Sequence, residues 1–100
     1  MRKPITKTQL EALEQNSNVH LVDVRSAQEY EKQHVPNAIN IPATELAADA
    51  GKFSKADAFV CICNHGGERS KSSAEYLYNE GFDNAFYLEG GTAGWFETDQ

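Results

Sequence analysis

The residues best suited to chemistry form one segment, Cys63–Ser70, with the sequence CNHGGERS. A thiol comes first, Gly66 and Gly67 follow, and Arg69 stands near the end. Because glycine tolerates positive φ, successive backbone N–H groups in such a loop can turn toward one point and bind an anion. A helix that begins just after the loop adds the partial positive charge of its N-terminus. The pattern therefore predicts a nucleophilic thiolate above an anion-binding loop.

We expect these groups to lower the pKa of Cys63 below that of a free thiol, about 8.5. The Arg69 guanidinium can hold an oxyanion through two hydrogen bonds. On local chemistry alone a second interpretation stays open, in which Cys63 is a small buried residue at a strand end and the glycines only make a turn. The predicted catalytic residue is Cys63, and the predicted substrate-binding residues are Asn64, His65, Gly66, Gly67, Glu68 and Arg69.

Two residues of this loop each allow more than one role. His65 either donates a proton or hydrogen bond to a bound substrate or lies exposed in solvent. Glu68 would repel an anionic substrate, so it is expected to face solvent, to pair with Lys71 or to orient Arg69.

The other potential metal ligands are not arranged as a metal site. The histidines are scattered at His20, His34 and His65, and the two cysteines have no second pair. Cys61 and Cys63 are also too close in sequence for an easy structural disulfide. Cys61 is expected in the core, and its alternative role is to resolve an oxidised Cys63. We predict no metal and no cofactor.

The pattern of apolar residues along the sequence predicts the strands and helices that position this loop. Short apolar runs predict strands at residues 19–24, 38–41, 58–63 and 85–88, and helical periodicity predicts helices at 8–15, 26–34, 42–50, 70–80 and around Trp95. Strands that alternate with helices in one domain indicate an α/β fold, a parallel sheet with helices on both faces. Active sites in such sheets lie at the carboxyl ends of the strands, and the strongest predicted strand ends at Cys63.

Arg25 follows another predicted strand at the same edge of the sheet. Two placements are open to it, one facing the pocket and one pairing with Glu29 a helical turn further along. We favour the pair with Glu29, at the start of a helix that the capping box of Ser26 and Glu29 predicts.

Length and charge narrow the function further. One hundred residues correspond to a single domain at 1–100. The net charge of −6 argues against general nucleic-acid binding and against adsorption to an anionic membrane. The sequence contains neither a long apolar run typical of a membrane span nor the apolar segment of a signal peptide. We therefore expect a cytoplasmic protein with no nucleic-acid or membrane partner.

Four ordered motifs resemble the single-domain rhodanese family of sulfurtransferases. They are Leu21–Arg25, Glu29–Tyr30 with His34–Pro42, Cys63 with Gly66 and Arg69–Ser70, and Leu88–Gly91 with Trp95. The resemblance covers nearly the whole chain and implies a five-stranded parallel core flanked by helices. It also implies a thiosulfate sulfurtransferase that forms a persulfide on Cys63 from thiosulfate or a similar small anionic donor. A thiol or a protein acceptor would then take the sulfur.

The sequence departs from the family pattern inside the loop. Arg69 lies six residues after Cys63, whereas many bacterial relatives have five. This longer spacing resembles the rhodanese-fold phosphatases and the related arsenate reductases, which use a wider loop for phosphate or arsenate. Glu68 before Arg69 strengthens that likeness, and Ile62 weakens it because a histidine is usual there. Alternatives to sulfur transfer are therefore phosphatase or arsenate reductase chemistry, or a non-catalytic sulfur-relay or binding module.

Overall fold

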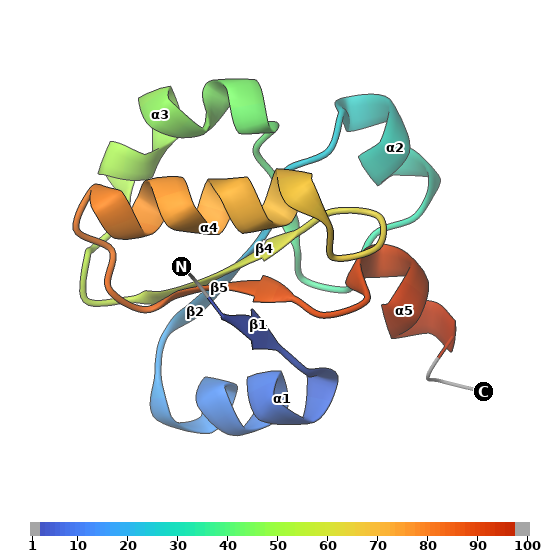
Figure 1. Cartoon of the computed structure of the whole chain (residues 1–100), viewed down its shortest axis with the longest axis horizontal. Coiled ribbons are helices and arrows are strands. Elements are labelled where there is room, and N and C mark those ends of the chain that lie inside the picture. Colours follow the sequence, from blue (N-terminus) through green and yellow to red (C-terminus); the bar gives the residue numbers. More distant parts are fainter. Residues whose placement is uncertain (1–2, 98–100) are drawn as a thin grey trace.

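A five-stranded sheet forms the centre of the computed structural model, which describes residues 3–97 (Figure 1). Its strands are β1 (Pro4–Ile5), β2 (Val19–Asp23), β3 (Ile39–Asn40), β4 (Ala58–Ile62) and β5 (Ala85–Leu88). The order across the sheet is β1-β5-β4-β2-β3, and every neighbouring pair is parallel. The predicted parallel α/β sheet is confirmed, including the five strands that the family resemblance implied.

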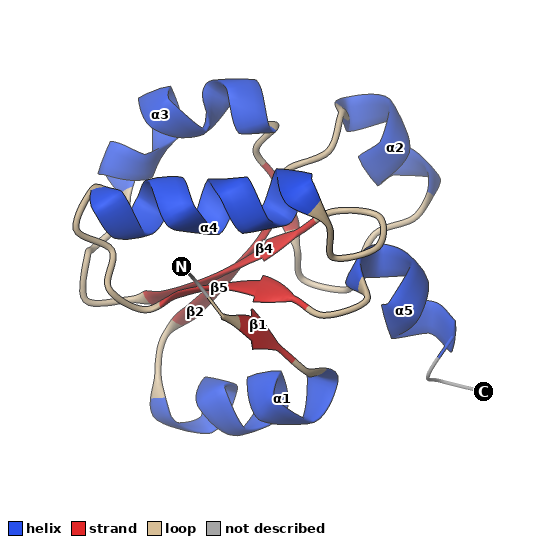
Figure 2. Ribbon diagram, in the orientation of Figure 1, coloured by secondary structure: helices blue, strands red, loops and turns tan. Residues whose placement is uncertain are grey.

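Helices cover both faces of this sheet (Figure 2). They are α1 (Lys7–Asn16), α2 (Ala27–Lys32), α3 (Leu46–Asp49), α4 (Glu68–Asn79) and α5 (Gly91–Glu97), with 3₁₀ turns η1 (Ala43–Glu45) and η2 (Ala50–Lys52) on either side of α3. Figure 1 shows α3 and α4 on one side of the sheet and α1 on the other. The sheet is therefore shielded from solvent on both faces, which explains the nearly continuous apolar run of β4.

The alternation of side chains along β4 divides the interior into two cores. Phe59 and Cys61 point into the core that Leu77 of α4 shares, while Val60 and Ile62 point into the core that contains Leu10 of α1. Cys61 has no exposed surface, so its predicted place in the core is confirmed. Burial, helped by the neighbouring sulfur of Cys63, raises the pKa of Cys61 to about 12.

Some elements differ from those that the sequence pattern predicts. Strand β1 was not expected from the pattern, because two residues are too short to show a period. Pairing with β5 holds it, with Pro4 opposite Tyr87 and Ile5 opposite Leu88. The helix expected at 42–50 is broken into η1, α3 and η2. Helix α4 begins at Glu68, two residues before the predicted start, and this shift changes the geometry of the Cys63 loop.

The chain changes direction across the sheet between β2 and β4. From β2 it continues to β3 on one side, and from β4 it continues to β5 on the other. The carboxyl ends of these two adjacent strands therefore border the switch point where parallel α/β proteins bind ligands. Arg25 follows the end of β2 and Cys63 follows the end of β4, so the topology brings both residues to this edge.

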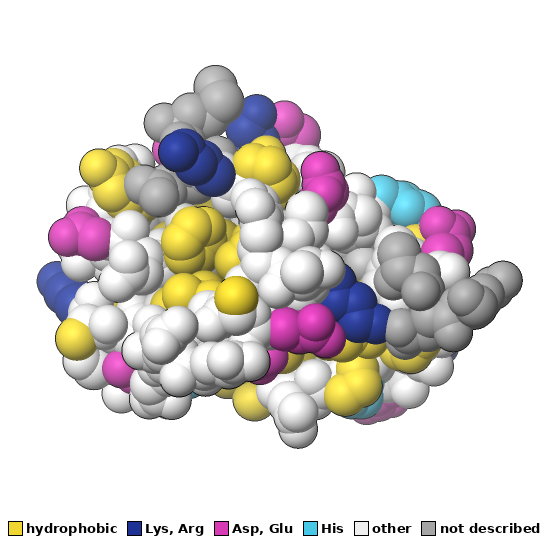
Figure 3. All heavy atoms as spheres, turned by 90° about the horizontal axis from the view of Figure 1, so that it is seen from below, with side chains coloured by type: hydrophobic (Ala, Val, Ile, Leu, Met, Phe, Trp, Pro, Cys, Tyr) yellow, Lys and Arg dark blue, Asp and Glu magenta, His cyan; other side chains and the backbone are white. Residues whose placement is uncertain are grey.

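The face of the molecule around α1 carries charges of both signs in scattered positions (Figure 3). Hydrophobic side chains gather near the middle of that face, where a hollow is lined by residues of β1 and α1 together with Phe86. Within residues 3–97, no helix is both long enough and apolar enough to cross a membrane.

Candidate active site

The Cys63 sulfur lies in a small polar cage at the carboxyl end of β4. The residue is only 3% exposed and its thiol is free. The backbone N–H of Gly67 donates to Sγ at 3.3 Å, and the hydroxyl oxygen of Ser70, in the first turn of α4, lies 3.1 Å from Sγ. Two hydrogen-bonding groups of the segment that starts α4 therefore converge on the nucleophile.

Opposing effects act on the ionisation of this thiol. Burial raises the pKa of Cys63, while hydrogen bonds from the Ser70 hydroxyl and from the backbone of Ser70, Gly67 and His65 lower it. The hydrogen bonds outweigh burial, and the pKa of Cys63 falls below that of an ordinary thiol. A lowered pKa at neutral pH means more thiolate, which is the form that acts as nucleophile.

The start of α5 fixes the orientation of the loop backbone. Thr92 N–H donates to the carbonyl oxygen of Cys63 at 2.9 Å, and Ala93 N–H donates to that of Asn64 at 3.0 Å. Because a trans peptide sets its N–H opposite its carbonyl, these bonds turn the following amides away from α5, and the His65 amide faces the sulfur. The Gly90-Gly91 turn at the start of α5 is thus part of the architecture of the site.

Gly91 is required for this close approach. Its φ is +59°, and a Cβ on Gly91 would lie 2.5 Å from the Cys63 carbonyl oxygen. Gly66 on the facing loop also has positive φ, at +73°, and a Cβ there would lie 2.8 Å from the backbone of Leu88 and Gly90. Both positions exclude a side chain, so the loop and the turn can pack backbone against backbone.

Helix α4 begins before Arg69, inside the longer spacing between Cys63 and Arg69. The segment between β4 and α4 is residues 63–67, and Glu68 is already the exposed first residue of α4. His65 is exposed in this loop, and its predicted role toward a bound substrate stays a prediction.

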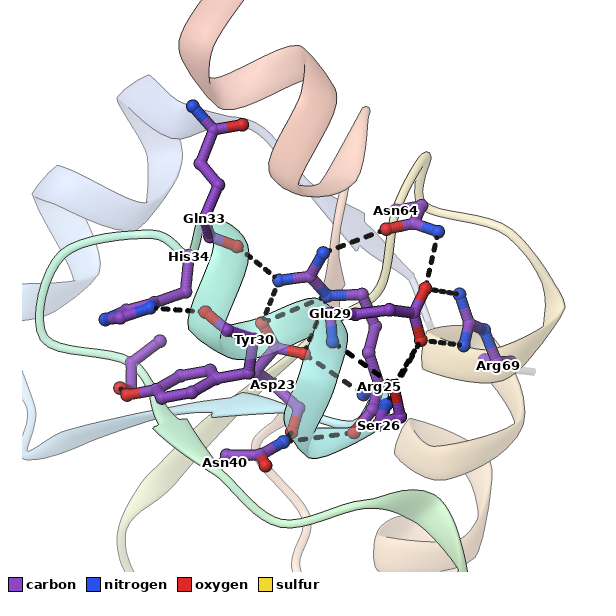
Figure 4. A network of polar contacts seen from close by, with 11 residues as sticks. Asp23, Arg25, Ser26, Glu29, Tyr30, Gln33, His34, Asn40, Asn64 and Arg69 are labelled. Carbon is purple, nitrogen blue, oxygen red and sulfur yellow. Dashed lines mark hydrogen bonds and ion pairs between the residues drawn. The ribbon is translucent and has the colours of Figure 1, made fainter.

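Arg69 is directed toward α2. Its guanidinium pairs with both carboxylate oxygens of Glu29, NH1 to Oε1 at 3.0 Å and NH2 to Oε2 at 3.3 Å (Figure 4). This pair, with hydrogen bonds from the Ser26 backbone and the Asn64 side chain, lowers the pKa of Glu29 to about 2. The pKa of Arg69 is raised in turn. Both groups are therefore charged at neutral pH, and each neutralises the other.

A polar network links this pair to the buried end of β2. Asn64 donates from Nδ2 to Glu29 at 2.9 Å and accepts from NH1 of Arg25 at 2.9 Å (Figure 4). Arg25, only 5% exposed, forms an ion pair with the fully buried Asp23 at 2.7 Å and donates to the Gln33 carbonyl oxygen. The predicted pair between Arg25 and Glu29 is therefore wrong. Arg25 pairs with Asp23 instead, because a buried carboxylate needs a cation beside it.

Two residues of the site were not predicted from sequence. Ser70 was used as a helix start and as part of a family motif, but no contact with the sulfur was predicted for it, although a hydroxyl in the first turn after a cysteine loop is placed to reach the sulfur. Glu29 was recognised as a capping residue, and it does cap α2 through Ser26. Its second contact, with Arg69, joins residues 40 positions apart and left no local signal. Among the described residues, no group of three or more His, Cys, Asp or Glu side chains could hold a metal ion.

Comparison with known proteins identifies the family. The family model for the rhodanese-like domain matches residues 6–98. This chain belongs to the rhodanese-like family. The resemblance of the four sequence motifs is thereby confirmed over nearly the full length.

Individual rhodanese-like relatives share about a third of the sequence. The thiosulfate sulfurtransferase GlpE of Shewanella oneidensis is 30% identical over 95 residues, which cover 95% of this chain and 93% of that protein. A putative sulfur carrier protein, YrkF of Bacillus subtilis, is 32% identical over 95 residues, 91% of this chain but only 51% of that protein. The solved structure of a rhodanese-related protein from Thermoplasma volcanium superposes with a TM-score of 0.81 at 29% identity, covering 96% of this chain and 92% of that one.

Proposed function

We propose that this protein is a sulfurtransferase that carries sulfane sulfur as a persulfide on Cys63. The observation that carries the proposal is the convergence of Gly67 N–H and the Ser70 hydroxyl on a sulfur whose pKa is lowered. Such a cage holds a thiolate before the reaction and a negatively charged terminal sulfur after it. The relatives named thiosulfate sulfurtransferase and sulfur carrier support the same chemistry.

The proposed first step is nucleophilic attack on the outer sulfur of the donor. With thiosulfate, the Cys63 thiolate forms a new S–S bond while the old S–S bond breaks, and sulfite leaves with the bonding electron pair. The product is a Cys63 persulfide anion, so no external oxidant or reductant is needed. A thiol, cyanide or a protein acceptor then attacks the terminal sulfur and releases the Cys63 thiolate.

Placement of the loop residues gives them different parts in this proposal. We assign the backbone amides of His65, Gly67 and Ser70 to the negative sulfur, and Asn64 to orienting the loop through its contacts with Arg25 and Glu29. Arg69 lies in the first turn of α4, and the Glu29 carboxylate takes two of its five N–H donors and neutralises its charge, which weakens its pull on an incoming anion. Glu68 is left to solvent.

Phosphate or arsenate chemistry requires a cation that can hold a tetrahedral dianion beside Cys63. Here the Glu29 carboxylate neutralises the Arg69 guanidinium. The geometry therefore supports sulfur transfer better than either alternative.

Turnover to cyanide tests the proposal. Wild-type protein is expected to form thiocyanate when supplied with thiosulfate or with an organic persulfide, and the Cys63→Ser variant is expected to form none above the uncatalysed rate. Cys61→Ala is the matched control, because it removes the other thiol, which lies outside the cage. Thiocyanate formation that survives in folded Cys63→Ser protein would refute the assignment. A stable persulfide on Cys63 without turnover would indicate a relay module instead.

A further inference from the structure

The cations beside the Cys63 loop are already matched by carboxylates. Arg69 is paired with Glu29 through two contacts, and Arg25 is paired with the buried Asp23. The polar network that flanks the loop therefore has no net formal charge. Glu68 and Lys71 add one charge of each sign to the first turn of α4. Fixed positive potential at the sulfur comes from backbone amides and the start of α4, and the thiolate itself uses it.

This balance of charges around the loop affects which sulfur donors can approach Cys63. Thiosulfate is a dianion, as hydrogen phosphate and hydrogen arsenate are, whereas a persulfide on an otherwise uncharged organic molecule carries one charge at most. Approach of a dianion to a thiolate requires a free cation, because like charges repel strongly at close range. Arg69 is an exposed cation in the first turn of α4, but the Glu29 carboxylate neutralises its charge and takes two of its five N–H donors.

An apolar hollow of about 490 Å³ adjoins Arg69. Its walls come from the start of α3 with η1 and from one side of α4, and they are Ala43, Leu46, Ala47, Ser72, Ser73 and Tyr76, with Glu68 and Arg69 at one end. The same first turn of α4 supplies Ser70 to the sulfur. An organic donor can place its uncharged carbon skeleton against these walls, while an inorganic dianion gains nothing from them.

We infer that Glu29 is a specificity-determining residue that tunes the Cys63 site toward organic persulfides of low charge and against dianionic donors, by holding the Arg69 guanidinium. This inference rests on the proposed sulfurtransferase function and narrows its substrate class. For an organic persulfide RSSH, the Cys63 thiolate attacks the outer sulfur, the S–S bond of the donor breaks, and RS⁻ leaves with the electron pair. The proton stays on the transferred sulfur, and charge is conserved.

Glu29→Gln is the variant that isolates this effect. Glutamine also serves at the third position of a capping box, so the start of α2 is preserved. Its single amide oxygen can keep the bond from the Ser26 backbone N–H, while the –NH2 group replaces the oxygen that accepts from Asn64 Nδ2 and Arg69 NH2. The substitution therefore removes the carboxylate charge that holds Arg69. Glu31→Gln is the matched control, because Glu31 is exposed on the same helix and its substitution changes net charge equally.

The experiment measures the rate at which Cys63 gains one sulfur, by intact mass in single-turnover reactions over a range of donor concentrations. The two donors are thiosulfate and the persulfide of N-acetylcysteine methyl ester, whose only ionisable group is the persulfide. Glu29→Gln is expected to raise the second-order rate constant for thiosulfate about ten-fold, the worth of one charge-assisted hydrogen bond. The second-order rate constant for the organic persulfide is expected to change less than about two-fold, because the low charge of that donor gains little from the Arg69 guanidinium.

Three outcomes decide the inference. The gain for thiosulfate should vanish in the double variant Glu29→Gln, Arg69→Gln, since the gain depends on Arg69. The role of Glu29 would be overturned by an equal gain for thiosulfate in Glu31→Gln, or by an unchanged donor preference in Glu29→Gln. Sulfur uptake by the wild-type protein would still support the proposed function in either case. Failure of folded wild-type protein to take sulfur from either donor would instead overturn the proposed function itself.

Discussion

Removing the Ser70 hydroxyl tests how the site makes Cys63 reactive. Ser70 is fully buried, and its Oγ lies 3.1 Å from Sγ and 3.2 Å from the Gly67 carbonyl oxygen. When Cys63 is a thiolate, the hydroxyl proton can be donated to sulfur. Ser70→Ala leaves the helix backbone and the amide bonds to Sγ in place. We therefore predict that this substitution raises the pKa of Cys63 and lowers the thiolate population at neutral pH.

The size of the effect follows from the worth of a hydrogen bond to a charged group. Such bonds contribute about 1.5–3 kcal/mol, and about 1.4 kcal/mol is a factor of ten in the ionisation equilibrium. The Ser70 proton can donate instead to the Gly67 carbonyl when the thiol is neutral, so we take the lower limit. The thiolate fraction at pH 7 should fall about ten-fold. Higher basicity makes the remaining thiolate a better nucleophile, so the rate of alkylation should fall only about three- to four-fold.

Two measurements on the same protein check this reasoning. Thiolate absorbance in the ultraviolet, followed against pH, gives the ionised fraction, and iodoacetamide alkylation gives the reactivity. Cys61 does not interfere, because burial raises its pKa to about 12. Ser73→Ala is the control, since the Ser73 hydroxyl donates to the Arg69 carbonyl oxygen and Ser73 lies one helical turn after Ser70 in α4. An unchanged titration curve in folded Ser70→Ala would mean that the amides alone hold the thiolate.

Three further predictions address the frame of the site. Arg25→Met leaves the buried Asp23 carboxylate unpaired and should lower the free energy of unfolding in urea by about 3–5 kcal/mol; adding Asp23→Asn should recover part of that loss. Gly91→Ala should cost at least about 1–2 kcal/mol from the left-handed backbone alone and should slow sulfur uptake, whereas Gly94→Ala, with no atom closer than 3.8 Å to the added Cβ, should do neither. An aryl phosphate should not be hydrolysed, and phosphatase activity dependent on Cys63 would reverse the proposed function.

Local sequence patterns predict most of the fold, because helix caps and the periodicity of apolar residues depend on residues that are close in sequence. The Ser26 and Glu29 capping box starts α2, and Gly81, with φ of +100°, follows the end of α4. The alternation of apolar runs with helical periods indicates the parallel sheet. Strand β1 escapes this reasoning because Pro4 and Ile5 become a strand only by pairing with β5.

The position of the candidate site and the lowered pKa of Cys63 were predicted, but the ion-pair partners of the arginines beside it were not. The strand that ends at Cys63 and the glycines that follow it are adjacent in sequence, so the loop could be predicted. The choice of partner for each arginine depends on the tertiary fold. Both Arg25 and Glu29 lie near the end of β2 and could pair by their spacing. In the fold, Arg25 pairs with the buried Asp23, and Glu29 pairs with Arg69, which α4 brings close to it. The spacing of Arg25 and Glu29 along the sequence shows neither ion pair.

Intact mass after incubation with a sulfur donor tests the central claim most directly. Wild-type protein, supplied with thiosulfate or the methyl ester persulfide, should gain the mass of one sulfur atom, and cyanide should remove it. Cys63→Ser should gain nothing, and Cys61→Ala should behave as wild type. If folded protein with a titratable Cys63 gains no sulfur from either donor, or if Cys63→Ser gains it equally, then Cys63 is not a sulfur carrier and the proposed sulfurtransferase function is wrong.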